Sequence, residues 1–268
     1  MRAAEAPGGD LALLRAAAEA AGEIAQHHFG RRVAAWDKPD GQGPVSEADL
    51  EIDLMLRERL LAARPGFAWL SEEAPDDPAR HAADAVFIVD PIDGTRAFLA
   101  GQKGFAHALA ISRAGKVTAA VVHLPLMGLT YAAAAGGGAY LNDRPLVTPP
   151  RSGLLGARIL ASGGQLDPAR WPGGLPAMER HFRPSLAWRL CLVAEGAFHG
   201  TVSLRDTWEW DTAAAALVAE EAGARVTDRH GRPLAFNTPG LRNPGLIAGP
   251  EGVHAGFLEG LRPRAEPG

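Results

Sequence analysis

The sequence predicts an α/β (α+β) fold, and three observations point to it. Residues 10–29 and 46–61 repeat apolar side chains every three or four positions, as amphipathic helices do. Residues 105–141 alternate short apolar runs with Gly-containing turns, which indicates an antiparallel meander. Beyond residue 150, strand-like and helix-like runs alternate, which is typical of α/β structure. We therefore expect an N-terminal α+β lobe, residues 1–150, and a C-terminal α/β lobe, residues 151–268, joined near the Pro- and Gly-containing residues 149–153.

The first half of the chain begins with two predicted helices. Asp10 is placed to cap the first helix and Gly30 to end it, after which residues 33–36 are consistent with a short strand. Residues 37–44 form a loop rich in Gly and Pro. The second helix begins at Ser46, because Asp49 three positions later completes the pattern of a capping box. We expect its apolar stripe to consist of Leu50, Leu54, Leu56, Leu60 and Leu61.

Strands account for most of the chain between residues 67 and 141. The predicted strands are 67–70, 86–89, 105–112, 116–123, 129–134 and 139–141, with residues 142–145 as a turn. In the second half we expect strands at 158–161, 201–204 and 224–227, and helices at 186–198 and 212–222. Gly223 is placed to end the second of these helices.

Composition excludes several classes of protein. The formal net charge of −4 argues against bulk binding of nucleic acid. No apolar run approaches the roughly 20 residues of a membrane helix, and the first ten residues do not form a secretory signal, so we expect a cytoplasmic protein without a membrane partner. A single cysteine, Cys191, excludes an internal disulfide framework and a cysteine-based zinc site.

Acidic side chains follow two of the predicted strands and begin two of the predicted helices. Glu72 follows strand 67–70, Asp90 and Asp93 follow strand 86–89, and Asp49 and Asp211 stand at helix starts. Each has an ordinary structural explanation: a capping box, a favourable helix dipole or a solvated strand end. Strand ends of α/β sheets meet at one rim, however, where such acids would form a pocket that requires a cation. Carboxylate oxygens favour Mg²⁺ over zinc.

Several motifs occur in a family-specific order. Residues 90–95 read Asp-Pro-Ile-Asp-Gly-Thr, residues 71–73 read Ser-Glu-Glu, and residues 210–214 read Trp-Asp-Thr-Ala-Ala. With matches at 44–49, 193–196, 221–224 and 227–228, the sequence resembles the inositol monophosphatase superfamily of Mg²⁺-dependent, lithium-sensitive phosphatases over roughly residues 10–240. The resemblance implies a five-layer α/β/α/β/α sandwich, with an antiparallel sheet in the N-terminal lobe and a mixed sheet in the C-terminal lobe.

The resemblance also implies a set of metal ligands. Glu72, Asp90 and the backbone carbonyl of Ile92 would hold one Mg²⁺, and Asp90, Asp93 and Asp211 a second. In this family a third, weaker ion is reached from the positions of Glu72 and Asp49, largely through water. The expected cofactor is therefore two or three Mg²⁺ ions.

Catalytic roles follow from the same resemblance. The Thr95 hydroxyl, paired with Asp49, would orient the attacking water, and the backbone N–H groups of Gly94 and Thr95 would meet the phosphate. Asp211 would lie near the leaving group. Glu72 would bind the metal ion that activates the attacking water. The implied reaction is metal-assisted in-line displacement at phosphorus without a covalent enzyme intermediate.

Two features favour the 3'(2'),5'-bisphosphate nucleotidase branch: Ser-Glu-Glu in place of Gly-Glu-Glu at residues 71–73, and Glu209 before the Trp-Asp motif. The expected substrate is 3'-phosphoadenosine 5'-phosphate, with Arg189 meeting its second phosphate or else lying on a helix surface. We also expect Glu209 and Asp211 to contact the substrate. Lys38 either approaches the substrate or stays solvated. Inositol 1-phosphate is the alternative substrate. The remaining interpretation is that the chain is a non-catalytic binding or regulatory protein with the same fold. A homodimer is common in the family.

Overall fold

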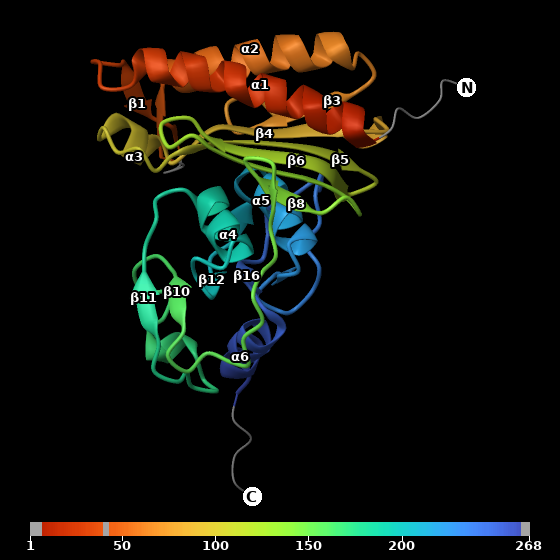
Figure 1. Cartoon of the computed structure of the whole chain (residues 1–268). Coiled ribbons are helices and arrows are strands. Elements are labelled where there is room, and N and C mark those ends of the chain that lie inside the picture. The colour runs from red at the N-terminus through yellow and green to blue at the C-terminus, as the bar shows by residue number, and fades with distance from the viewer. Residues whose placement is uncertain (1–6, 40–42, 264–268) are drawn as a thin grey trace, which may run out of the picture.

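The computed structural model describes residues 7–39 and 43–263, and within them the chain forms five layers (Figure 1). Helices α1 (Pro7–His28) and α2 (Glu47–Ala63) cover one face of a seven-stranded sheet. Helices α4 (Leu186–Ala194) and α5 (Glu209–Glu221) lie between that sheet and a five-stranded sheet, and α6 (Glu251–Leu261) covers the far side. Three buried apolar clusters fill the spaces between these layers. The predicted five-layer sandwich is confirmed.

The outer helical layer differs from prediction in two details. Helix α1 begins at Pro7, so Asp10 does not cap it; the Asp10 carboxylate instead pairs with Arg64 and Arg113. Helix α2 does begin with the predicted capping box between Ser46 and Asp49. Its buried apolar side chains form a single i, i+4 row, Ala48, Ile52, Leu56 and Leu60, and Asp49 and Asp53 are buried beside that row.

Two leucines of the predicted stripe on α2 lie on the solvent side. Leu50 is 41% exposed and Leu54 is 59% exposed. Each lies two positions, or about 200° around the helix, from a member of the buried row, so the expected contact with the sheet was wrong for both. Upstream of α2, β1 (Ala35–Asp37) and β2 (Pro44–Ser46) form an antiparallel pair. The loop between them includes residues 40–42, which lie outside the described part of the chain.

The seven-stranded sheet carries the acidic motif. Its order is β3-β4-β5-β6-β7-β8-β9, with β3 and β4 parallel and every other pair antiparallel. The bounds are β3 Ala68–Ser71, β4 Val86–Asp93, β5 Ala106–Arg113, β6 Lys116–Leu124, β7 Leu129–Ala134, β8 Ala139–Leu141 and β9 Arg144–Pro145. The predicted meander is confirmed, but the parallel pair makes the sheet only mostly antiparallel.

Strand β4 is longer than predicted, because it continues through the acidic motif to Asp93 instead of ending at Val89. Its pairing with β5 shifts between Asp90 and Asp93, which marks a β-bulge. Gly94 follows with φ of 106°, a left-handed conformation that favours glycine, and the short helix α3 (Thr95–Leu99) begins directly after it.

The middle helices are short and rich in alanine. Ala213 to Ala216 of α5 are all buried and allow the helix to lie close to the sheet, where it contacts β4 to β8. Helix α5 begins at Glu209, three residues before the predicted start, and α4 ends at Ala194, before the predicted end at 198. Gly196, with φ of 75°, accounts for the earlier end.

The second sheet is mixed, as predicted, with order β11-β10-β12-β16-β14. Its strands are β10 Arg158–Leu160, β11 Glu179–His181, β12 Gly200–Ser203, β14 Arg225–Thr227 and β16 Leu246–Gly249; β13 (Thr207–Trp208) pairs separately with β15 (Arg242–Asn243). Short 3₁₀ turns occupy Pro78–Ala82 and Pro168–Arg170. The chain passes from one sheet to the other between residues 145 and 158. Within the described residues, no helix has the length and apolar character that a membrane crossing requires.

Candidate active site

Three carboxylates from separate elements meet at one edge of the seven-stranded sheet. Glu72, Asp90 and Asp211 each place an oxygen within 4.8 Å of the other two. Glu72 follows β3, and since β3 and β4 are parallel with Ser71 opposite Val89, it lies beside Asp90 of β4. Asp211, in the first turn of α5, arrives from the middle layer. The predicted convergence of these acids is confirmed.

The electrostatics of this cluster favour a bound cation. Burial raises the pKa of Asp90, and the neighbouring carboxylates of Glu72 and Asp93 raise it further. Burial likewise raises the pKa of Asp211, with added repulsion from Asp93 and Glu72. Among the described residues, Asp90 Oδ1 is buried without a hydrogen-bond partner. An unpartnered carboxylate oxygen that faces two further acids fits a hard divalent cation.

Asp93 is held from the opposite side by α4. Its Oδ2 accepts hydrogen bonds from the Ser185 hydroxyl at 2.7 Å and from the Ala187 backbone N–H at 2.6 Å. Burial raises the pKa of Asp93 to about 6, although these two bonds act to lower it. Ser185 was not among the site residues predicted from the sequence. Its position directly before an apolar helical run, where it caps α4, was the available signal.

The predicted pairing of Thr95 with Asp49 is present. The Thr95 hydroxyl lies 3.1 Å from Asp49 Oδ1 and 3.0 Å from the Ile92 carbonyl oxygen. Burial raises the pKa of Asp49 to about 6, against hydrogen bonds from Ser46 and Thr95 that lower it. Because the Thr95 proton is directed to these acceptors, the hydroxyl lone pairs are free to accept a hydrogen bond from water.

Lys38 lies at the acidic cluster. Its Nζ donates to Glu72 at 2.8 Å and to Glu73 at 2.7 Å. Burial works against the charged ammonium, but the two carboxylates outweigh it, and the pKa of Lys38 is raised. Lys38 is therefore not left in solvent but is held at the acidic cluster, and its approach to a substrate stays a prediction.

The acids open into a cleft of about 360 Å³. Its walls include all five expected metal-ligand residues and also Gly94, Thr95 and Arg189. Asp49 and Lys38 are not among the lining residues. Asp49 accepts a hydrogen bond from Thr95, and Lys38 donates one to Glu72, so both contact residues that line the cleft. Eight further lining residues were not predicted as site residues, and they come from β2, α3, β13 and the loops: Gly43, Pro44, Arg96, Ala97, Ser162, Phe182, Pro184 and Trp208.

Arg189 is buried at the cleft and is not a helix-surface residue. Its guanidinium donates to the carbonyls of Arg183 and Pro184 and, at 3.1 Å, to the Ser162 hydroxyl. The guanidinium carbon lies 4.7 Å from the centre of the Phe182 ring. These contacts fix the side chain in one orientation at the wall of the cleft.

Glu209 does not line the cleft, so its expected contact with substrate was wrong. The side chain is fully buried, and its carboxylate accepts hydrogen bonds from the backbone N–H groups of Asn237 and Thr238 and from the Thr238 hydroxyl. Glu209 and Asp211 are two positions apart at the start of a helix and therefore point in nearly opposite directions. Glu209 anchors the loop at 237–238, while Asp211 faces the other acids.

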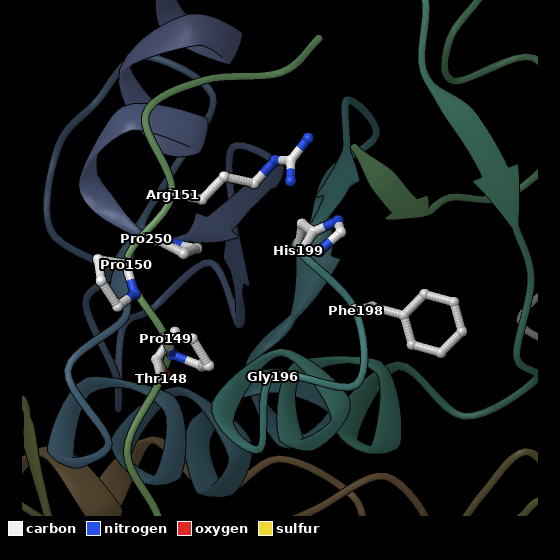
Figure 2. Close-up of a pocket in the computed structure, with 8 residues that line it drawn as sticks. All are labelled: Thr148, Pro149, Pro150, Arg151, Gly196, Phe198, His199 and Pro250. Atoms are coloured by element: carbon white, nitrogen blue, oxygen red, sulfur yellow. The ribbon is translucent and has the colours of Figure 1, made fainter. Parts of the chain in front are cut away.

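A second, smaller cavity of about 120 Å³ lies where the chain passes between the two sheets (Figure 2). None of its lining residues is acidic: Thr148, Pro149, Pro150, Arg151, Gly196, Phe198, His199 and Pro250. Its polar groups are bonded within the chain, since Arg151 donates to the carbonyls of Gly153 and Leu155 and His199 Nδ1 accepts from the Arg158 N–H.

Clustered carboxylates on a five-layer sandwich define a metal-dependent phosphatase. The sequence profile of the inositol monophosphatase family matches residues 10–262, so the chain belongs to the inositol monophosphatase family. It is similar to an inositol-1-monophosphatase from Rhizobium meliloti (strain 1021), with 37% identity over 202 residues, covering 71% of this chain and 74% of the relative.

A second relative is the 3'(2'),5'-bisphosphate nucleotidase CysQ of Aggregatibacter actinomycetemcomitans, which is 30% identical over 241 residues, covering 87% of this chain and 89% of the relative. The crystal structure of the extragenic suppressor protein suhB from Bartonella henselae matches the fold with a TM-score of 0.81 at 27% identity, covering 95% of this chain and 98% of that one. The chain is thus a phosphoric monoester hydrolase of this family.

Proposed function

We propose that this phosphatase is Mg²⁺-dependent and that its substrate is 3'-phosphoadenosine 5'-phosphate. The observation that carries the choice of substrate is the part of the cleft wall that combines the aromatic side chains of Phe182 and Trp208 with the buried Arg189. A planar base can stack on such a wall.

The aromatic part of this wall is rigid. The Trp208 ring stacks on Trp210 with ring centres 4.7 Å apart, and the Arg242 guanidinium lies 3.6 Å from the centre of the Trp208 ring. Both faces of the Trp208 ring are therefore covered, so Trp208 can offer a base only its edge, and the half-exposed Phe182 ring is the one on which a base can stack. This favours a substrate with a flat apolar group next to the phosphate.

The metal ligands proposed here are Glu72, Asp90, Asp93, Asp211 and the Ile92 carbonyl, all of which line the cleft. Bound Mg²⁺ would neutralise charge on the phosphate and favour ionisation of a water molecule. The unpartnered Asp90 oxygen and the raised pKa values of the acids support this assignment.

The remaining steps fall to the chain's own groups. Thr95, oriented by Asp49, accepts a hydrogen bond from the attacking water and directs it towards phosphorus. The N–H groups of Gly94 and Thr95 bind phosphate oxygens. Lys38 holds Glu72, and Asp211 lies on the side of the leaving group.

Arg189 is proposed to bind the second phosphate. A guanidinium has five N–H donors, and three hydrogen bonds are made within the chain, which leaves two for a ligand. Two parallel N–H groups suit a phosphate better than a lysine ammonium does.

Inositol 1-phosphate is the second candidate substrate, because the relative from Rhizobium meliloti is 37% identical and is an inositol-1-monophosphatase. The two candidates differ in the group attached to the phosphate and in the number of phosphates. A substrate panel separates them.

The test measures phosphate release with Mg²⁺ from 3'-phosphoadenosine 5'-phosphate, inositol 1-phosphate and adenosine 5'-phosphate, with and without Li⁺. We expect kcat/KM to be at least about tenfold higher for the bisphosphate, which corresponds to about 1.4 kcal/mol of added binding in the transition state. The variant Arg189→Lys should raise KM for the bisphosphate and leave that for inositol 1-phosphate nearly unchanged. A preference for inositol 1-phosphate would overturn the proposed substrate, and no phosphate release from any of the three would overturn the activity.

A further inference from the structure

We propose that His107 is a positioning residue for the metal-binding segment of β4. His107 lies on the neighbouring strand β5 and its side chain is fully buried. Its Nδ1 donates a hydrogen bond to the carbonyl oxygen of Pro91, the residue between the ligands Asp90 and Ile92. This inference rests on the proposed metal site and adds a residue to it that no sequence motif indicates.

The strand pairing gives His107 a particular place. Asp90 pairs with Ala108 and Asp93 pairs with Ala106, so Pro91 and Ile92 both stand opposite the single residue His107. An arrangement of two residues against one is a β-bulge, which turns side chains and carbonyls away from their regular directions. Here the bulge lies within the segment that lines the cleft with Asp90, Ile92 and Asp93.

Proline makes the bulge dependent on a side-chain hydrogen bond. Pro91 has no N–H, so it cannot be held to β5 through a donor of its own. The His107 side chain supplies a donor to the Pro91 carbonyl instead. The bond therefore fixes the peptide unit that joins Pro91 to Ile92, and so restrains the backbone directly before the unit that carries the Ile92 carbonyl.

The neutral imidazole of His107 has one N–H proton to donate to the Pro91 carbonyl. Burial lowers the pKa of His107 to about 4, so the ring is neutral at physiological pH. Because its acceptor is a carbonyl, the proton resides on Nδ1. Among the described residues Nε2 is buried without a hydrogen-bond partner, so Pro91 is the one polar contact that orients the ring.

Packing prevents the ring from turning away. The His107 ring centre lies 6.0 Å from that of Phe105 and 6.1 Å from that of His123. His123 stands directly opposite on β6 but hydrogen-bonds Thr130 and does not contact the acidic motif. It therefore provides a control: a partly buried histidine in the same sheet that differs in its hydrogen-bond partner.

The test compares His107→Val, which removes the donor, with His107→Asn, which keeps a donor near the position of Nδ1, and with His123→Val. Binding of Mg²⁺ alone is measured by calorimetry, without substrate. Loss of a residue that orients a ligand commonly costs 10- to 100-fold in metal affinity. We expect His107→Val to weaken Mg²⁺ binding by at least about tenfold. The Asn variant and His123→Val should bind Mg²⁺ within about threefold of the unaltered protein, a change of less than 1 kcal/mol.

A purely structural role would give a different pattern. If His107→Val bound Mg²⁺ as well as the unaltered protein, or if His123→Val lost as much affinity, the proposal would be overturned. If the Val variant fails to fold, His107→Gln replaces it in the test. The amide donor of Gln lies near the position of Nε2, so this variant should bind Mg²⁺ as weakly as we expect of the Val variant. A Gln variant with normal Mg²⁺ affinity would also overturn the proposal.

Kinetics give an independent readout. With p-nitrophenyl phosphate as substrate, His107→Val should raise the Mg²⁺ concentration at half-maximal rate while kcat at saturating Mg²⁺ stays within about threefold. If the protein binds Mg²⁺ but releases no phosphate from any phosphomonoester, the proposed function is refuted. The proposal for His107 is then decided by the calorimetric Mg²⁺ affinities alone. A protein that binds no Mg²⁺ would refute both.

Discussion

Mg²⁺ should stabilise the fold more strongly at high pH than at low pH. The metal-free acids are buried, and burial raises the pKa of Asp93 to about 6 from its usual 3.8, even with its hydrogen bonds to Ser185 and Ala187. A group with a raised pKa binds its proton more tightly in the folded protein than in the unfolded chain. The metal-free protein therefore loses stability as the pH rises from about 4 through about 6, and the loss persists above that range.

The expected loss of stability follows from the rise in the pKa of Asp93. About two pKa units for Asp93 correspond to about 3 kcal/mol. At about 2 to 4 °C of Tm per kcal/mol for a chain of this size, this single group lowers Tm by about 6 to 12 °C above pH 6. Asp49, whose pKa burial also raises to about 6, acts in the same direction. Bound Mg²⁺ favours the charged carboxylates and removes the loss.

The assay is thermal unfolding in excess Mg²⁺ and in EDTA across a pH series. Titratable groups distant from the site change Tm equally in Mg²⁺ and in EDTA. The difference in Tm between these two conditions therefore reports only on the acids of the cleft. We expect that difference to grow by about 6 °C or more between about pH 4.5 and pH 7. Asp143→Asn, at a carboxylate on the surface, serves as the matched control and should leave the difference unchanged. An equal Mg²⁺ effect at both pH values would refute the reasoning.

Three further predictions concern single residues. Asp93→Asn should lower phosphate release by at least about 100-fold, since it removes one ligand charge. In EDTA at neutral pH its Tm should lie above that of the unaltered protein, because the amide keeps the shape and carries no buried charge. Leu54→Ser should change the free energy of unfolding in urea by less than about 0.5 kcal/mol, whereas Leu56→Ala on the buried row should cost about 2 to 5 kcal/mol. Arg80→Leu should cost about 3 kcal/mol in the same assay, because this buried guanidinium binds Asp76 and the loop at 237–238; no measurable loss would show that the loop is held without it.

Local sequence signals predicted the parts of the fold that depend on neighbouring residues. The capping box at Ser46 begins α2 as expected, and the hairpin from β5 to β6 follows from the turn at Ala114 and Gly115, which both have positive φ. In the stretch after residue 231, β16 and α6 were not predicted, although Val253, Phe257 and Leu261 recur at helical spacing in α6. The Gly and Pro residues of this stretch obscure the pattern, and long-range pairing with β12 and β14 determines the strand.

The acidic ligands could be predicted because each follows a strand or begins a helix, and topology then brings such positions together. Predictions for side chains beyond the motif were less successful. Glu209 is adjacent to the motif in sequence, yet helix geometry directs it away from the cleft. Phe182 and Ser162 line the cleft from loops, where position depends on the path of the whole second sheet and no short pattern encodes it.

The arrangement of the ligands couples the metal to the packing of the layers. Glu72 and Asp90 belong to the first sheet, whereas Asp211 arrives with α5 and Asp93 is held by the start of α4. Docking the middle helices on the sheet therefore brings like charges within 4.8 Å of each other. Apolar burial between α5 and the sheet must offset that repulsion in the absence of an ion. A cation at the cluster turns the same contact into an attraction, so the ion that serves catalysis also strengthens the junction between the layers.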